Sequence, residues 1–280
     1  ASSLEQHLLG DLSPVDSDYF LEMAGIHNSE LRKRLCTLTN GTPVYLDLCV
    51  DRYYYLLNRG EITDISMFGQ NTRDLIERFI RYMDNSLQDL VYLLTCLNNW
   101  DDAFVHHVAD KTLSNFSETA FSKIKSYSFV IETNNNKYNI HQTVKAVLFK
   151  SCPQNIRKKT GKALMEKFSS TLEARQYNAD YGDALLHMAQ SGLLLHEDEN
   201  SFYSFYNEHL QEHIRKFIRA GYVQHADNII DFIFEGIISN EENPTELYIS
   251  LLNDKSSTYR FLGNYDKAKS IAEHALSLAA

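Results

Sequence analysis

Apolar residues recur every three to four positions along most of this 280-residue chain, which is the spacing that places them on one face of an α-helix. Between residues 13 and 60, three such segments begin at the capping residues Ser13, Asn28 and Thr42, and each ends at a glycine. We expect their buried faces to contain Tyr19, Phe20, Met23, Leu31, Leu35, Leu38, Tyr45, Leu48, Cys49, Tyr53 and Leu56.

The second and third of these segments meet in the sequence Gly41-Thr42-Pro43. Glycine can take the positive φ that often ends a helix, threonine can cap the next helix, and proline fits its first turn. We therefore expect a sharp, rigid corner between two helices, with the ring of Pro43 at that corner.

Residues 62–69 break the helical spacing and are predicted to form a loop between domains, with Met67 and Phe68 exposed. Helical spacing then returns in four segments, 72–84, 87–97, 100–110 and 115–125. The last of them begins with Asn115-Phe-Ser-Glu118, which has the spacing of a capping box.

A change of period follows, from helical to alternating. Residues 127–132 are aromatic and β-branched, and residues 137–141 resemble a returning strand, so a β-hairpin is predicted around the asparagines between them. Helical spacing resumes at Val144, Val147 and Leu148. Short helices followed by one hairpin have the order of a winged helix, and the second strand delivers His141 to a helix start, where free backbone N–H groups attract anions.

Beyond Pro153 the pattern is helical throughout. A small-x-large-x-x-Ala pattern begins at Ala179, Gly221 and Gly263, with a constant spacing of 42 residues. The large residues are Tyr181, Val223 and Tyr265, and the alanines are Ala184, Ala226 and Ala268. A common period predicts stacked helical hairpins, and the last copy has the spacing of a tetratricopeptide repeat. At Phe202, Phe205 and Tyr206 the helical spacing favours core packing over ligand binding.

Charge and cysteine content narrow the classes of function. The 27 Lys and Arg residues are outnumbered by 37 Asp and Glu, which gives a formal net charge of −10 and disfavours nucleic acid as a partner. Four widely spaced cysteines, Cys36, Cys49, Cys96 and Cys152, are predicted to be small core residues in a reducing compartment. No segment is apolar enough to predict a membrane span or a signal peptide, so we expect a cytoplasmic protein with no membrane partner.

Catalytic and metal-binding patterns are incomplete. His209 and His213 are one helical turn apart, but Leu210 stands where a zinc protease has its catalytic glutamate and no third ligand is evident. The segment around Gly161-Lys162-Ala163 lacks the upstream glycine and the hydroxyl of a P-loop. We predict no catalytic residues, no metal and no cofactor held by this chain itself, and therefore no enzymatic activity of its own.

At Gly41-Thr42-Pro43 and at Asn139-Ile140-His141-Gln142 the chain resembles the signal-transducing NTPases with numerous domains, the STAND class, which is NB-ARC-like. In that class a P-loop domain is followed by a small helical domain with a Gly-x-Pro motif, a winged helix with a Met-His-Asp motif, and a repeat-built sensor. The resemblance implies a mainly α chain with a small helical domain at 1–66, a winged-helix domain with one β-hairpin at 67–152, and solenoid-like, tetratricopeptide-like repeats at 153–280.

The resemblance also implies roles for two residues. Pro43 would lie against the adenine of a nucleotide, and His141 would contact the β-phosphate of ADP, both in a larger parent protein whose P-loop domain precedes this chain. Ile140 replaces the methionine of the motif conservatively. Gln142 replaces its aspartate, which puts the bracing role of that aspartate in doubt here.

Two functions follow as expectations. The first is a regulatory and sensor region of a STAND-type ATPase, which closes over ADP or ATP bound by its own P-loop domain. In this function the repeats sense a protein or peptide, and that binding is coupled to a nucleotide switch and an oligomer formed on activation. The alternative is a helical-repeat scaffold for protein–protein interaction with no nucleotide role. A winged-helix transcription regulator is disfavoured by the charge.

Overall fold

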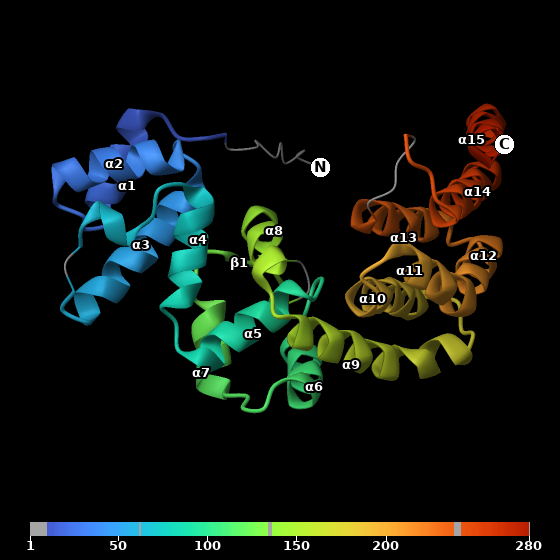
Figure 1. Ribbon diagram of the computed structural model, residues 1–280, viewed down its shortest axis with the longest axis horizontal. Helices are drawn as coiled ribbons and strands as arrows, with labels where there is room; N and C mark the ends of the chain where they lie inside the picture. Colours follow the sequence, from blue (N-terminus) through green and yellow to red (C-terminus); the bar gives the residue numbers. More distant parts are fainter. Residues whose placement is uncertain (1–9, 62, 134–135, 238–241, 280) are drawn as a thin grey trace, which may run out of the picture. The chain divides into compact units, whose positions relative to one another are not determined.

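The computed structural model describes residues 10–61, 63–133, 136–237 and 242–279 (Figure 1). Within these residues the fold is mainly α-helical with a single two-stranded antiparallel hairpin, which confirms the predicted class. The chain divides into two compact units, residues 1–153 and 154–280. The finer division into three domains stays a prediction.

The first unit contains eight α-helices, a short 3₁₀ helix and the hairpin, counted over its described residues. Its elements are α1 (Pro14–Met23), α2 (Ser29–Thr39), α3 (Pro43–Asn58), η1 (Ile65–Met67), α4 (Thr72–Arg81), α5 (Asn85–Thr95), α6 (Asp102–Thr112), α7 (Glu118–Lys125), β1 (Val130–Thr133), β2 (Lys137–Ile140) and α8 (Gln142–Ser151).

The predicted buried face of α1 is wrong. Tyr19 and Met23 are mostly exposed, at 62% and 70%, whereas Ser17 and Leu21 are fully buried. The buried pair is spaced by one helical turn, and the small Ser17 lets α1 pack closely on α2 and α3. A sequence pattern that counts only apolar residues overlooks a serine on the packing face.

Two caps and one loop also differ from expectation. The side chain of Thr42 makes no capping hydrogen bond at α3. Ser117, rather than Asn115, caps α7 by accepting from the backbone N–H of Ala120. Phe68 was expected to be exposed, but it is fully buried directly after η1, because that short helix turns the predicted loop back onto the core.

The hairpin pairs β1 with β2 in the register Val130 to Ile140 and Thr133 to Lys137. A β-bridge joins Trp100 to Tyr138 through two backbone hydrogen bonds of 2.7 and 2.8 Å, so Trp100 lies outside helix α6, in which it was expected. Its ring is fully buried and stacks on Tyr138. The segment before α6 therefore pairs with the β1–β2 hairpin as a short third strand would.

The second unit consists of helical hairpins. Its elements are α9 (Gln154–Glu173), α10 (Ala179–Leu195), α11 (Glu199–Phe205), the π-helical turn η3 (Tyr206–Leu210), α12 (Gln211–Arg219), α13 (Val223–Gly236), α14 (Glu246–Phe261) and α15 (Tyr265–Ala279). Consecutive helices pack together as α9 with α10, α12 with α13 and α14 with α15.

Each copy of the repeated pattern opens the second helix of one of these pairs. The three alanines of the pattern are buried, and so are Tyr181 and Val223, but Tyr265 is 68% exposed. At the end of this series the aromatic position therefore faces no neighbouring helix pair among the described residues. Whether the copies are true repeats stays a prediction.

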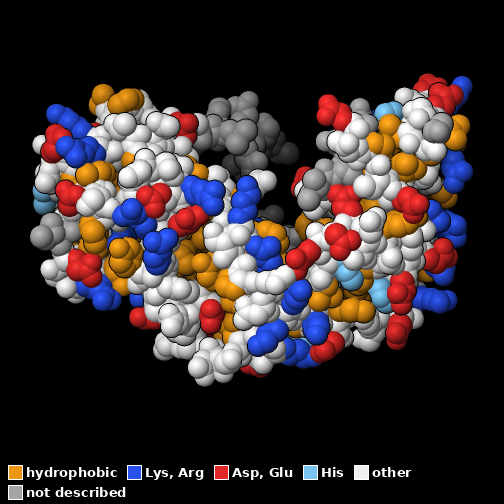
Figure 2. All heavy atoms as spheres, in the orientation of Figure 1, with side chains coloured by type: hydrophobic (Ala, Val, Ile, Leu, Met, Phe, Trp, Pro, Cys, Tyr) orange, Lys and Arg blue, Asp and Glu red, His pale blue; other side chains and the backbone are white. Residues whose placement is uncertain are grey.

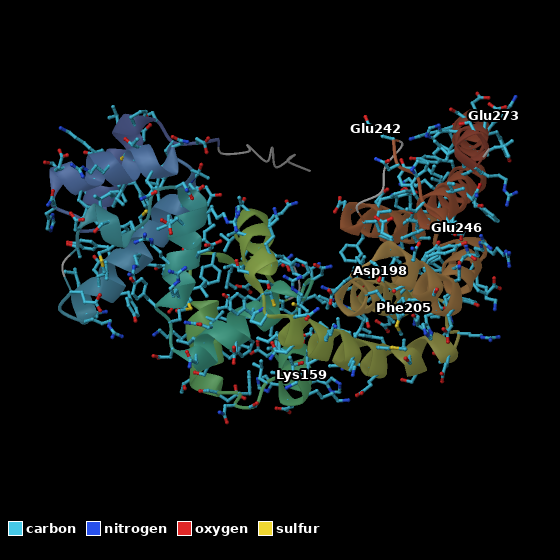
Figure 3. The ribbon with its side chains drawn as sticks, viewed as in Figure 1. Lys159, Asp198, Phe205, Glu242, Glu246 and Glu273 are labelled. Atoms are coloured by element: carbon cyan, nitrogen blue, oxygen red, sulfur yellow. The ribbon has the colours of Figure 1, made fainter. Side chains whose placement is uncertain are left out.

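An aromatic group fills the centre of this unit. Phe202, Phe205 and Tyr206 are all buried, in agreement with the sequence pattern, and Phe205 is labelled in Figure 3. Gly192 on α10 leaves room for these rings, because a Cβ there would lie 2.5 Å from Phe205. The close approach of α10 and α11 therefore requires a glycine at this position.

Candidate functional site

The predicted corner between α2 and α3 is present and is held by backbone geometry. Asn40 and Gly41 both take positive φ, at +50° and +78°. The Gly41 carbonyl accepts a hydrogen bond from the Leu12 N–H at 2.8 Å, and a Cβ on Gly41 would lie 2.1 Å from the Leu12 carbonyl oxygen. Glycine is thus required at this position for two separate reasons, φ and space.

A hollow of about 820 Å³ lies beside this corner, between α1 and α2, and Gly41 lines its edge. Arg32 crosses its wall, with Nε 2.9 Å from Asp18 Oδ1 and Nη1 donating to the Ile26 carbonyl. The pKa of Arg32 is raised by that hydrogen bond to Asp18. This guanidinium therefore holds α1 and α2 together, and its charge is already matched.

Pro43 is the first residue of α3 and is half-buried, as expected for a first-turn proline. Its ring does not line the hollow described above. The structure thus supports the rigid corner at Pro43, while the expected contact with an adenine stays a prediction.

His141 occupies the N-cap position of α8, directly after β2. Its backbone N–H donates to the Phe129 carbonyl at 2.8 Å, but its side chain makes no capping bond, and the buried Nδ1 has no hydrogen-bond partner among the described residues. Burial lowers the pKa of His141 below its usual 6.5. A neutral imidazole with an unsatisfied nitrogen, next to the N–H groups of a helix start, gains free energy when a polar ligand reaches it.

Pro43 begins α3, and His141 directly precedes α8. Helix α4 packs against both α3 and α8 and lies between them in the first unit (Figure 1). A ligand that touched both residues would have to reach past the edge of α4.

The side chain of Lys145, one turn into α8, makes polar contacts that the sequence did not indicate. Its Nζ donates to the Leu97 carbonyl at 2.6 Å and to Asn98 Oδ1 at 2.5 Å, so it joins α8 to the segment that leads to Trp100. In the part of the chain that the structure describes, no carboxylate offsets the burial of Lys145, and this burial lowers its pKa to about 8. This ammonium positions the helix that carries His141.

We expect Lys145→Met to change how stability depends on pH. Between pH 8 and 10 the unfolded chain keeps a proton on Lys145 that the folded chain has lost, so the free energy of unfolding of the wild type rises relative to the variant. The rise is at most about 1.4 kcal/mol per pH unit. Urea unfolding followed by Trp100 fluorescence measures it. Lys123→Met, at an exposed position on α7, is the control, and equal profiles for Lys145→Met and the wild type would contradict the expectation.

The two histidines with zinc-protease spacing have other neighbours. His213 Nδ1 lies 2.6 Å from the Tyr181 hydroxyl, and the ring of His209 packs 4.8 Å from that of Phe205. In the described part of the chain no three His, Cys, Asp or Glu side chains are grouped so that they could hold a metal. Of the four cysteines, Cys96 and Cys152 place their Sγ atoms 3.7 Å apart although they are distant in sequence.

A buried carboxylate organises the polar contacts of the second unit. Asp254 on α14 is 1% exposed and accepts hydrogen bonds from the Tyr206 hydroxyl at 2.6 Å and from Arg215 Nε at 2.7 Å. The Gln211 amide lies 3.4 Å away. Burial, and then the charge of Asp254, raise the pKa of Tyr206 well above its usual value, which keeps the hydroxyl a hydrogen-bond donor.

The π-helical turn makes this arrangement possible. Tyr206 is its first residue, and Gln211 and Arg215 follow on α12. A π-helical turn holds an additional residue compared with an α-helical one, so it rotates the helix that follows about its axis. The side chain of Tyr206 at the start of the turn and those of Gln211 and Arg215 after it thereby converge on one carboxylate.

Comparisons with known proteins give a distant similarity. No protein-family model and no curated protein matches the chain. Among solved structures, a signal transduction ATPase with numerous domains (STAND) protein with a tetratricopeptide repeat sensor, from Pyrococcus horikoshii, is similar at a TM-score of 0.45 and 14% identity, over 96% of this chain and 41% of that chain. The chain thus spans less than half of the length of that protein, and a TM-score of this size assigns no function. Over the described residues, no helix is long and apolar enough to cross a membrane.

Proposed function

We propose that this chain is the non-catalytic regulatory and sensor region of a STAND-type ATPase. The observation that carries the proposal is the order of three features: the Gly41-Thr42-Pro43 corner, a hairpin that ends at His141, and a unit of helical hairpins. The first unit would close over a nucleotide held by a P-loop domain, with Pro43 on the base and His141 on a phosphate.

The chemistry of His141 supports this role. The free N–H groups of the first turn of α8 suit an anion, and the unsatisfied Nδ1 of His141 at the N-cap would gain a partner if the ring turned toward it. Because its pKa is lowered, the imidazole would bind a phosphate as a neutral hydrogen-bond donor, with little dependence on pH near 7. Lys145 would hold α8 in place while the ligand is bound.

In this proposal the nucleotide and the repeats act on one equilibrium. A nucleotide bound to the closed state favours that state, and a protein bound to the repeats favours the open state by its difference in affinity. The open state would form the oligomer. In this proposal hydrolysis belongs to the P-loop domain, which holds the phosphates and the metal ion in proteins of this kind.

The test is made on the full-length product of the gene that encodes this sequence. We expect the purified protein to retain ADP, and His141→Ala to retain on the order of tenfold less, because one hydrogen bond to phosphate is lost. Nucleotide is released with acid and measured by chromatography. His27→Ala, at an exposed position of the same unit, is the matched control. A protein without nucleotide, or equal retention in both variants, would exclude the proposed site.

A second function, a helical-repeat scaffold without a nucleotide role, is favoured by the surface of α14 and α15. Phe261, Leu262, Tyr265 and Leu276 are each between 48% and 72% exposed there. Large apolar side chains gathered on a helix pair are typical of a protein-binding surface. This function would be preferred if the full-length protein carried no nucleotide but bound a protein through the second unit.

A further inference from the structure

A hollow of about 220 Å³ lies where α12 and α14 pack together in the second unit. Residues 154–280 contain five arginines, and three of them, Arg215, Arg219 and Arg260, line this hollow. Figure 2 shows Lys and Arg side chains along the edge formed by α12 and α14. Such a grouping is unexpected in a chain with a net charge of −10.

Two of these three arginines form no salt bridge within the described residues. The carboxylate of Glu212, one turn before Arg215 on α12, acts electrostatically on Arg215 and on Arg219. Asp254 is the acidic residue among those that line the hollow, and it is bonded to Arg215. Arg219 and Arg260 are exposed and form no ion pair within the described residues. Among the residues that line the hollow, positive charges exceed negative charges by two, so its chemistry suits an anion.

Arg215 is held in a fixed position beside this pair. Its bond to Asp254 uses Nε, and Asp254 is itself held by the Tyr206 hydroxyl. A guanidinium fixed through Nε has two terminal nitrogens with further N–H donors, in the planar arrangement that matches a carboxylate. Little side-chain entropy would be lost by Arg215 when an anion binds.

The size and rim of the hollow indicate the kind of anion. A volume of about 220 Å³ accommodates a side-chain carboxylate and its methylene groups but is too small for most of a nucleotide. Phe261, which is 48% exposed, lines the same hollow and offers an apolar surface to neighbouring atoms of a chain. A site that binds a protein segment typically offers charged groups and an apolar surface side by side, as the arginines and Phe261 do here.

We propose that this hollow binds an acidic segment of a protein partner by gripping a carboxylate between Arg219, Arg260 and Arg215. This inference rests on the sensor role proposed above, for which it names the partner chemistry. The acidic first turn of α14, which contains Glu246 (Figure 3), lies at the other end of that helix from Arg260 and does not compete for the arginines.

Fluorescence polarisation of a labelled hexaglutamate peptide, added to the 280-residue chain at constant ionic strength, tests the site. We expect binding that Arg219→Gln with Arg260→Gln weakens on the order of tenfold or more, since two charge-assisted contacts are lost. Arg219→Lys with Arg260→Lys keeps both charges but not the planar donors, so its affinity should lie between those of the wild type and the glutamine variant.

The matched control is Lys159→Gln with Lys162→Gln, which removes the same charge from exposed positions on α9 (Figure 3). Equal loss of affinity in this control would show non-specific attraction and overturn the proposal, as would unchanged binding by the arginine variant with a native circular dichroism spectrum. Inorganic phosphate serves as competitor, and displacement of the peptide by phosphate at lower concentrations than by free glutamate would assign the hollow to phosphate groups instead.

This test is independent of the nucleotide experiment. Loss of peptide binding with ADP still retained would leave the nucleotide switch in place and remove the acidic partner. Peptide binding in a full-length protein without ADP would keep the acidic site and favour the scaffold function.

Discussion

Replacing Gly41 with alanine is expected to lower the free energy of unfolding of the first unit by about 3 kcal/mol. Positive φ accounts for about 1 kcal/mol of this. The rest is a steric clash, because the Leu12 carbonyl oxygen would lie 2.1 Å from the new Cβ. Leu12 cannot move away freely, since its N–H donates a hydrogen bond to the Gly41 carbonyl. Trp100, the one tryptophan of the chain, is buried in this unit, so its fluorescence during urea unfolding reports the change.

Gly60 provides the control for this experiment. Its φ is +68°, close to that of Gly41, but beyond its own chain neighbours no heavy atom of the described residues lies within 4 Å of where a Cβ would be. Gly60→Ala should therefore cost about 1 kcal/mol, the part due to φ alone. If the two variants are equally stable, the α2–α3 corner can relax away from Leu12, and its rigidity would be refuted.

Removing the carboxylate of Asp254 is expected to be equally costly in the second unit. Asp254→Ala leaves the buried Tyr206 hydroxyl and the Arg215 guanidinium without their shared acceptor, which should lower the free energy of unfolding by about 3 kcal/mol. Circular dichroism follows the whole chain during urea unfolding. Trp100 fluorescence follows the first unit, whose transition should stay in place.

Glu273→Ala is the matched control for Asp254→Ala, because it removes a carboxylate from the surface instead of from the interior. Glu273 is exposed on α15 and lies 3.7 Å from Lys269, a pair that contributes less than about 1 kcal/mol (Figure 3). A cost for Asp254→Ala no larger than that of Glu273→Ala would mean that water replaces the carboxylate, and that Arg215 is not held in place by it.

Much of the fold was predictable because local signals and packing agree. The apolar face of α4, formed by Leu75, Ile76, Phe79 and Ile80, is buried as its spacing indicates, and so is Met83 just beyond the end of the helix. Local signals failed where a neighbouring element decides burial. Phe68 follows a loop pattern but is covered because η1 folds back. Tyr19 is apolar enough for a core but lies on the side of α1 that no helix among the described residues covers.

The candidate sites were predictable only in part. Gly41 and His141 stand in short motifs, so sequence alone could indicate a corner and a histidine at a helix start. That His141 Nδ1 is left unsatisfied depends on the surrounding packing, which no local pattern contains. Arg219 and Arg260 are 41 residues apart, and each is an ordinary basic residue in the last turn of its helix until α12 and α14 are placed side by side.

The π-helical turn before α12 behaves as a one-residue insertion within a continuous helix. Deleting a single residue from 206–210 would restore ordinary helical winding and rotate the residues that follow by about 100°. Gln211 and Arg215 would then turn away from Asp254, and the arginine-lined hollow would be dismantled without any substitution of its side chains. The length of this turn therefore encodes which face of α12 meets α14. Related chains with the same three arginines but one residue fewer here would not share the site.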